Sequence, residues 1–276
     1  MKHVEPSNAH RMAGLSVQER HLIDSLVARE VAAVGAEHVI ELFGISRSSA
    51  NQILSRLCRK GWLQRVKRGV YAVVPLGSSS PEPAVEDAWP LAEALFAPCF
   101  ISGWSAAEHW DLTEQIFNSV SVVTGKRQRR SLHRAAGVTF RTRSLGAGRL
   151  FGAKRIWLGS RRIKVADPHR LVIDILDDPT FGGGGRHTVD VVREYWRSPH
   201  ASPDRLLDYA RRFGRGTVFK RLGFLSETFS SVSTDWLDEC RDGISSGVSL
   251  LDPAGSRKGG IVTRWNLRIN LPMDDR

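Results

Sequence analysis

A single glycine, Gly44, separates two short stretches of the sequence that both have the apolar spacing of helices. Two helices that meet at a steep angle need a tight turn, and glycine adopts the positive φ of such a turn without steric cost. Residues 36–60 therefore predict a helix-turn-helix, in which Ser46 caps the second helix. The residues expected on its inner side are Val39, Ile40, Leu42, Ala50, Ile53, Leu54 and Leu57.

Elements on both sides extend this pair into a domain. Residues 15–29 predict an earlier helix, because Ser16 and Glu19 form a capping box ahead of an apolar stripe. Gly61 ends the third helix, and 62–66 and 70–74 then predict two strands of a hairpin. Three helices followed by a hairpin are the order of a winged helix-turn-helix, which we expect over residues 1–75.

The helix after Gly44 exposes side chains suited to reading double-stranded DNA, because Arg pairs with guanine, Asn or Gln with adenine, and Ser with either. Residues 44–75 contain seven Lys and Arg and no Asp or Glu, which favours DNA over a solvated three-helix packing unit. The expected base contacts are Arg47, Ser48, Asn51 and Gln52. The expected phosphate contacts are Arg56, Arg59 and Lys60, with Arg65, Lys67 and Arg68 on the hairpin.

Charge is unevenly distributed along the chain, whose formal net charge is +11. Residues 1–75 have a net charge of +5, 76–119 of −7, 120–170 of +13 and 171–276 of zero. Such a balance suggests an anionic partner. The predicted loop 125–134 contains a second group of cations. They form either a second contact to DNA or RNA or simply a charged loop in solvent, and we give the two interpretations equal weight. This second basic patch consists of Lys126, Arg127, Arg129, Arg130 and Arg134, and a basic sheet face could add Arg141, Arg143, Arg155, Arg161, Arg162 and Lys164.

The second half of the chain predicts a separate domain. Residues 76–83 are rich in Pro, Gly and Ser and indicate a linker. Residues 84–276 then predict two short helices, a small sheet from strands between 118 and 165, several helices from 167 to 244, and a strand within 261–271. The expected fold class is α+β, with a winged helix-turn-helix followed by a larger mixed α+β domain.

Several classes of protein fit the sequence poorly. The first 13 residues lack the apolar core of a secretory signal, and the longest apolar stretch, near 94–101, is shorter than the ~20 residues of a spanning helix. Cys58, Cys99 and Cys240 are far apart, which favours free thiols over disulfides or a zinc finger. We expect a cytoplasmic protein with no membrane partner, metal or cofactor.

Catalytic motifs are equally hard to find. Residues 182–185 are four glycines without the Lys-Ser/Thr of a phosphate loop, and we interpret them as a flexible linker. Asp174, Asp177 and Asp178 suggest a metal site, but no His or further carboxylate has ligand spacing. We therefore expect no enzyme. Two alternatives remain: a nuclease whose second domain cuts what the first one binds, and a solitary repressor with a small-molecule pocket.

Four runs of residues carry a family resemblance: 57–71 (LCRKGWLQRVKRGVY), 101–112 (ISGWSAAEHWDL), 165–174 (VADPHRLVID) and 220–225 (KRLGFL). Together they resemble the AbiEi family, the antitoxin and transcriptional-regulator half of bacterial type IV abortive-infection systems. The resemblance implies a winged domain that represses its own promoter at inverted repeats. It also implies a C-terminal antitoxin domain that opposes a nucleotidyltransferase toxin without needing a stable complex.

Overall fold

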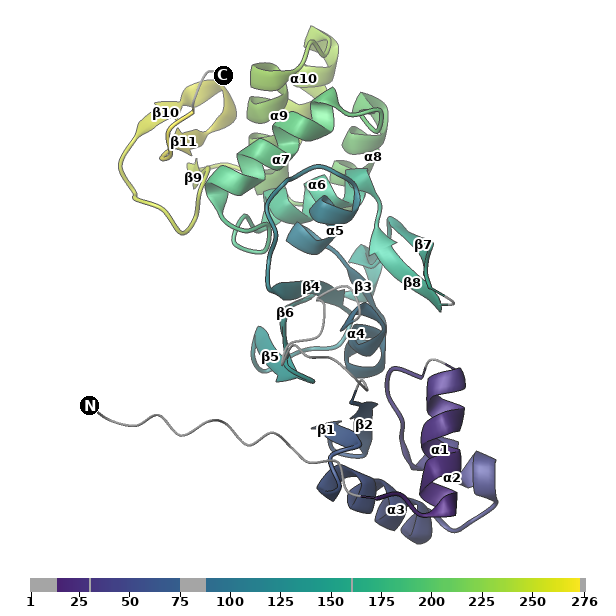
Figure 1. Ribbon diagram of the computed structural model, residues 1–276. Coiled ribbons are helices and arrows are strands. Elements are labelled where there is room, and N and C mark those ends of the chain that lie inside the picture. Colours follow the sequence, from purple (N-terminus) through teal and green to yellow (C-terminus); the bar gives the residue numbers. More distant parts are fainter. Residues whose placement is uncertain (1–13, 30, 75–87, 160, 274–276) are drawn as a thin grey trace, which may run out of the picture. The chain divides into compact units, whose positions relative to one another are not determined.

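The computed structural model describes residues 14–29, 31–74, 88–159 and 161–273 (Figure 1). The chain forms two compact units, one from 1–95 with 134–138 and the other from 96–133 with 139–276. Together they contain helices and mixed sheets, so the predicted α+β class is confirmed. The linker predicted at 76–83 lies outside the described residues.

The described N-terminal part of the first unit has the predicted order of three helices and a hairpin. In chain order these are α1 (Val17–Ala28), α2 (Ala36–Phe43), α3 (Arg47–Arg59), β1 (Leu63–Lys67) and β2 (Val70–Val73). Both halves of the capping box form: the Glu19 amide donates to Ser16 Oγ at 3.3 Å, and the Ser16 amide donates to Glu19 Oε2 at 2.9 Å. Gly44 ends α2 with a φ of 64°, which is the left-handed turn predicted for it.

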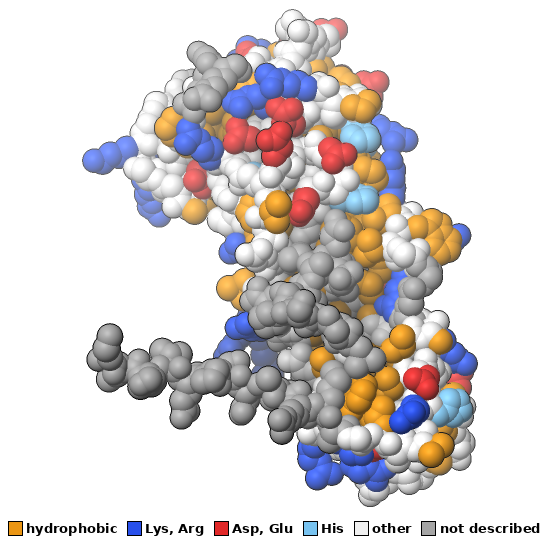
Figure 2. Space-filling model, in the orientation of Figure 1, with side chains coloured by type: hydrophobic (Ala, Val, Ile, Leu, Met, Phe, Trp, Pro, Cys, Tyr) orange, Lys and Arg blue, Asp and Glu red, His pale blue; other side chains and the backbone are white. Residues whose placement is uncertain are grey.

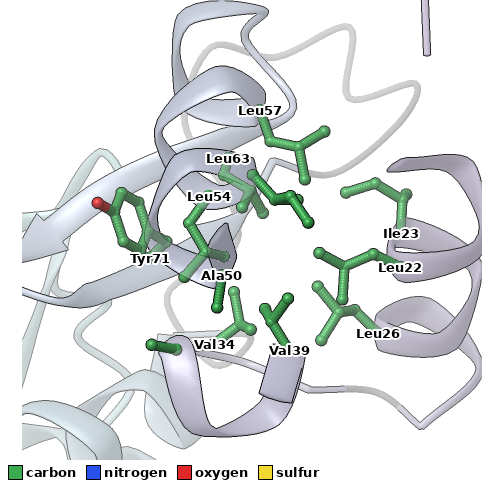
Figure 3. Close-up of a cluster of buried hydrophobic side chains, with 12 residues drawn as sticks. Leu22, Ile23, Leu26, Val34, Val39, Ala50, Leu54, Leu57, Leu63 and Tyr71 are labelled. Carbon is green, nitrogen blue, oxygen red and sulfur yellow. The ribbon is translucent and has the colours of Figure 1, made fainter. Parts of the chain in front are cut away.

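One buried cluster holds these elements together (Figure 3). Leu22, Ile23 and Leu26 of α1 point toward Val39 of α2 and toward the inner face of α3. That inner face consists of Ala50, Ile53, Leu54 and Leu57, as the apolar spacing predicts. Burying these side chains is the main favourable contribution to the domain's stability, and it leaves the opposite face of α3 in solvent.

A short strand-like segment before α2 joins the hairpin. The Val34 amide donates to the Tyr71 carbonyl at 2.7 Å, and the Tyr71 amide donates back to the Val34 carbonyl at 2.9 Å. This bridge adds a third extended segment to the β1–β2 hairpin and holds β2 against the helices. Sequence reasoning missed it, because a single bridging residue leaves no periodic pattern.

The second unit contains most of a mixed six-stranded sheet in the order β5-β6-β4-β3-β8-β7, of which residues 134–138, from the end of β5 to the start of β6, belong to the first unit. β4 runs parallel to β6 and antiparallel to β3, and β7 and β8 form an antiparallel hairpin at one edge. The strands are β3 (Cys99–Ile101), β4 (Ser119–Thr124), β5 (Leu132–Ala135), β6 (Val138–Ser144), β7 (Ala153–Leu158) and β8 (Arg161–Ala166). Helix α4 (Trp89–Phe96), which belongs to the first unit except for its last residue, precedes β3, and a 3₁₀ turn, η2 (Ala147–Arg149), follows β6.

Helices dominate the rest of this unit (Figure 1). In α6 every residue except the last is buried. They are α5 (Gly103–His109), α6 (Pro168–Asp177), α7 (Gly185–Arg197), α8 (Pro203–Phe213), α9 (Gly216–Phe229) and α10 (Thr234–Asp242). A second sheet in the order β10-β11-β9 follows, from β9 (Ser249–Leu250), β10 (Gly260–Val262) and β11 (Leu267–Ile269), with η3 (Thr263–Trp265) between the last two. The single strand predicted within 261–271 is therefore wrong, because the chain turns back on itself at η3.

Two further local predictions fail for reasons of packing. Residues 182–185 are no flexible linker: a Cβ on Gly182 would lie 2.8 Å from Ile175 Cβ, and one on Gly185 would lie 2.5 Å from Asp252 Cβ. These glycines permit close packing at the start of α7. The predicted loop over 125–134 is also too long, because β5 begins at Leu132 and includes Arg134.

Candidate nucleic-acid interface

Helix α3 presents one continuous polar face. Ser46 caps its first turn, since Ser46 Oγ accepts the Ser49 amide at 3.2 Å. The predicted base contacts on this helix are all exposed: Arg47, Ser48, Asn51 and Gln52. Ser55 and the predicted phosphate contacts Arg56 and Arg59 are exposed as well. Figure 2 shows basic side chains over the part of this unit where α3 lies.

Most of these residues share one open surface hollow of about 410 Å³. The first two turns of α3 contribute amide and hydroxyl groups, which suit base edges, and the last two turns contribute guanidinium groups, which suit phosphates. Both kinds of group therefore lie along one helix. The described residues that line it are Ser48, Asn51, Gln52, Ser55, Arg56 and Arg59.

Arg47 belongs to the same exposed face but has an acidic partner. Its guanidinium forms an ion pair with Glu37 of α2, and both side chains are well exposed. A pair in solvent contributes little free energy and is readily exchanged for another anion. Arg47 can thus bind an external anion if it releases Glu37.

Lys60 and Arg56 have a different role in the free protein. Lys60 Nζ donates to Glu19 Oε2 at 2.6 Å, and Arg56 Nε lies 3.4 Å from Glu19 Oε1. Glu19 is buried, and Lys60 is half-buried beside it. Lys60 therefore ties α3 to α1, and we expect less phosphate contact from it than from the exposed Arg59.

The wing extends the basic surface beyond α3. In the β1–β2 hairpin Arg65 pairs across from Tyr71, and the turn passes through Gly69 with a φ of 76°. Arg65, Lys67 and Arg68 are exposed. Among the described residues no carboxylate forms an ion pair with these three or with Arg59, so all four cations are open to an external anion.

The match to known proteins falls on these same elements. Residues 21–74 match the family model described as "Transcriptional regulator, AbiEi antitoxin". This stretch of the chain is therefore similar to an AbiEi-type regulator domain. The matched range begins in α1 and ends just after β2, so the AbiEi-type domain includes α3 and the wing.

The fold of the whole chain also has a solved relative. The RV2827C protein from Mycobacterium tuberculosis is 17% identical, with a TM-score of 0.63 over 94% of each chain. At this identity the likeness shows that the two chains share a fold. No functionally curated protein matches the sequence.

Acid should weaken the AbiEi-type domain through Glu19. Burial raises the pKa of this carboxyl, but hydrogen bonds from Lys60 and Ser16 outweigh it and lower the pKa to about 2, from an ordinary 4.5. Because the folded-state pKa is the lower one, the stabilisation is complete above pH 4.5 and is lost as the pH falls toward 2.

Glu19→Gln tests this linkage. We expect the variant to be less stable than wild type by about 2–3 kcal/mol at pH 7, and the gap to close as the pH falls from 4.5 to 2. Hydrogen exchange of α1 peptides in the full chain, with both proteins compared at each pH, measures the gap. A gap independent of pH would contradict the role of the Glu19–Lys60 pair.

The cations of the predicted second basic patch are all exposed. Lys126, Arg127, Arg129 and Arg130 lie in the loop after β4, whose backbone is held by Ser144: the Gln128 amide donates to Ser144 Oγ at 3.1 Å. Arg134 lies on β5 rather than in this loop, also exposed. The role of these five residues stays a prediction.

The predicted basic sheet face is wrong for its two β6 members. Arg143 forms an ion pair with the buried Asp177 and donates to the Asp174 carbonyl at 2.9 Å. Arg141 donates to the Thr180 carbonyl at 3.2 Å and lies over the Trp104 ring. Both arginines are therefore internal supports of the second unit, whereas Arg155, Arg162 and Lys164 on the β7–β8 hairpin are exposed.

The aspartates of α6 are engaged by protein cations. Fully buried Asp174 accepts two hydrogen bonds from Arg170, at 2.9 and 3.0 Å, and one from Ser102 at 2.8 Å. This bond occupies the hydroxyl of Ser102, the residue before α5, which makes no capping hydrogen bond to that helix. Within the described ranges, no group of three or more His, Cys, Asp or Glu is placed to hold a metal ion.

None of the described helices is both long and apolar enough to cross a membrane.

Proposed function

We propose that this protein is a sequence-specific transcriptional regulator that binds double-stranded DNA through residues 1–75. Helix α3 enters the major groove with Ser48, Asn51 and Gln52 at base edges, and Arg47 joins them on releasing Glu37. Arg56 and Arg59, with a smaller share from Lys60, contact phosphate. Arg65, Lys67 and Arg68 of the wing hold the strand beside it. The observation that carries the proposal is the exposed polar face of α3 beside four cations that pair with no carboxylate in the part of the chain that the structure describes, within a stretch similar to a regulator family.

The finer proposal concerns the biological role. The family description names an antitoxin, and we propose that this chain represses its own promoter at inverted repeats and opposes a nucleotidyltransferase toxin. Residues 84–276, after the linker at 76–83, would then form the antitoxin-like domain, acting without a stable complex with the toxin. A nucleotidyltransferase gene beside this one supports the pairing, whereas its absence favours a solitary repressor.

The structure gives no support to the nuclease alternative. Cleavage with Mg²⁺ needs carboxylates that are open to the metal. Asp174 is saturated by Arg170 and Ser102, and Asp177 lies against Arg143 and Arg215. We therefore propose no catalytic residue, cofactor or metal.

Footprinting on the chain's own upstream region tests the assignment of α3. Asn51→Ala should weaken binding by about 1–3 kcal/mol at one base pair while leaving random duplex unaffected. Lys67→Ala should weaken cognate and random duplexes alike, because a phosphate contact carries no sequence information. Equal losses on both duplexes for both variants would refute this division of roles, and no retention of any duplex at low ionic strength would refute DNA binding.

A further inference from the structure

The β7–β8 hairpin at the edge of the six-stranded sheet carries an exposed aromatic and basic face. Arg155 lies opposite Lys164 and Trp157 opposite Arg162, so these four side chains share one face of the hairpin. The paired residues Ile156 and Ile163 lie on the other face, where Ile163 is buried. We refer to Arg155, Trp157, Arg162 and Lys164 as the hairpin patch.

Trp157 is the unusual member of the hairpin patch. It is 63% exposed, although an indole outside a core leaves a large apolar surface in unfavourable contact with water. The Arg162 guanidinium lies over the ring, 4.5 Å from its centre. This cation covers one side of the indole and holds it in place, while the exposed fraction leaves the rest of the ring open to a partner.

The charge of the hairpin has one sign. Residues 153–166 contain five Lys and Arg and no Asp or Glu. Arg155, Arg162 and Lys164 are exposed, and among the described residues none of them forms an ion pair with a carboxylate. In Figure 2 hydrophobic and basic side chains lie next to each other in the region where Figure 1 labels β7 and β8.

Protection of a sheet edge explains only part of this pattern. Charged residues on the edge strand β7 discourage pairing with another chain. An exposed tryptophan does the opposite, because it offers apolar surface at the same edge. The combination instead matches surfaces that bind unpaired nucleotides, in which an aromatic ring stacks on a base and cations follow the phosphates.

We propose that the hairpin patch binds a single-stranded nucleic-acid segment, with a base stacked on Trp157 and phosphates held by Arg155, Arg162 and Lys164. Bases within a duplex are covered on both faces by their neighbours, so the indole can stack only on an unpaired base. This site lies in the second unit and consists of other residues than the duplex-binding surface proposed for α3 and the wing.

Fluorescence anisotropy of the full chain with a labelled oligodeoxythymidine of about 12 nucleotides tests the hairpin patch. Trp157→Ala should weaken binding at least about tenfold, whereas Trp157→Phe, which keeps a ring, should stay within about threefold of wild type. Ile116→Ala is the matched control, because Ile116 is also an exposed apolar residue, at 82%, outside the hairpin. Arg257→Ala controls for loss of one exposed cation.

The outcomes separate this proposal from the duplex-binding function. Asn51→Ala should leave oligodeoxythymidine binding unchanged, and Trp157→Ala should leave the affinity for the upstream duplex unchanged. Equal binding of the oligonucleotide by wild type and Trp157→Ala, or no binding by wild type, would overturn the proposal. Displacement of the oligonucleotide by polyglutamate at equal charge concentration would overturn it too, by pointing to an acidic protein.

Discussion

Replacing Asp174 by alanine is expected to lower the free energy of unfolding of the second unit by about 3–5 kcal/mol, because the change leaves a buried cation without its partner. Arg170 and Asp174 are both 0% exposed. The Arg170 guanidinium lies between the rings of Phe100, Phe151 and Phe213, at 5.2, 4.6 and 5.1 Å from their centres. These rings cannot replace a carboxylate. Urea denaturation with hydrogen exchange of α6 peptides measures the loss.

Two further variants separate charge from packing. Ser102→Ala removes one hydrogen bond to Asp174 but leaves the ion pair, so its cost should be only about 1 kcal/mol. The double variant Arg170→Met, Asp174→Ala removes both charges and keeps an apolar chain among the rings, so it should recover most of the stability that Asp174→Ala loses. If the double variant is less stable than Asp174→Ala, an unpaired Arg170 charge is not the cause.

Removing Arg59, Arg65, Lys67 and Arg68 together should have the largest effect on DNA binding. If each neutralises one phosphate, the slope of log affinity against log salt should become shallower by about 3 to 4. Affinity for any duplex at low ionic strength should fall by roughly a hundredfold to a thousandfold. Titrations of cognate and random duplexes at several salt concentrations measure both quantities.

A charge-matched variant provides the control for this experiment. Replacing Arg197, Arg241, Arg257 and Lys258 by alanine removes four exposed cations from the second unit. The net charge of the chain then falls equally, but no cation of α3 or the wing is lost. An equal change of slope in both variants would mean that overall charge, and not the α3 and wing surface, determines the affinity for DNA.

Features that depend on near neighbours in the chain could be predicted. The capping box of α1, the left-handed Gly44 and the Ser46 cap each involve residues within about one helical turn of one another. The periodicity of Ala50, Ile53, Leu54 and Leu57 also identified the buried face of α3, and with it the exposed one. The polar surface proposed to read DNA was visible in the sequence for this reason.

The sequence by itself therefore determined the winged order of elements and the exposed face of α3, because helix periodicity and capping are local. Only the tertiary structure decided which charged groups are free. Arg143 is bound by the carboxylate of Asp177, and Lys60 is bound to Glu19, 41 residues away in the chain. Arg170 and Asp174 are one helical turn apart on α6, but their full burial depends on the elements packed around that helix. Trp157 and the cations beside it stay in solvent. A charge or a ring looks the same in the sequence whether it is buried with a partner or exposed, because burial depends on segments that meet only in the fold.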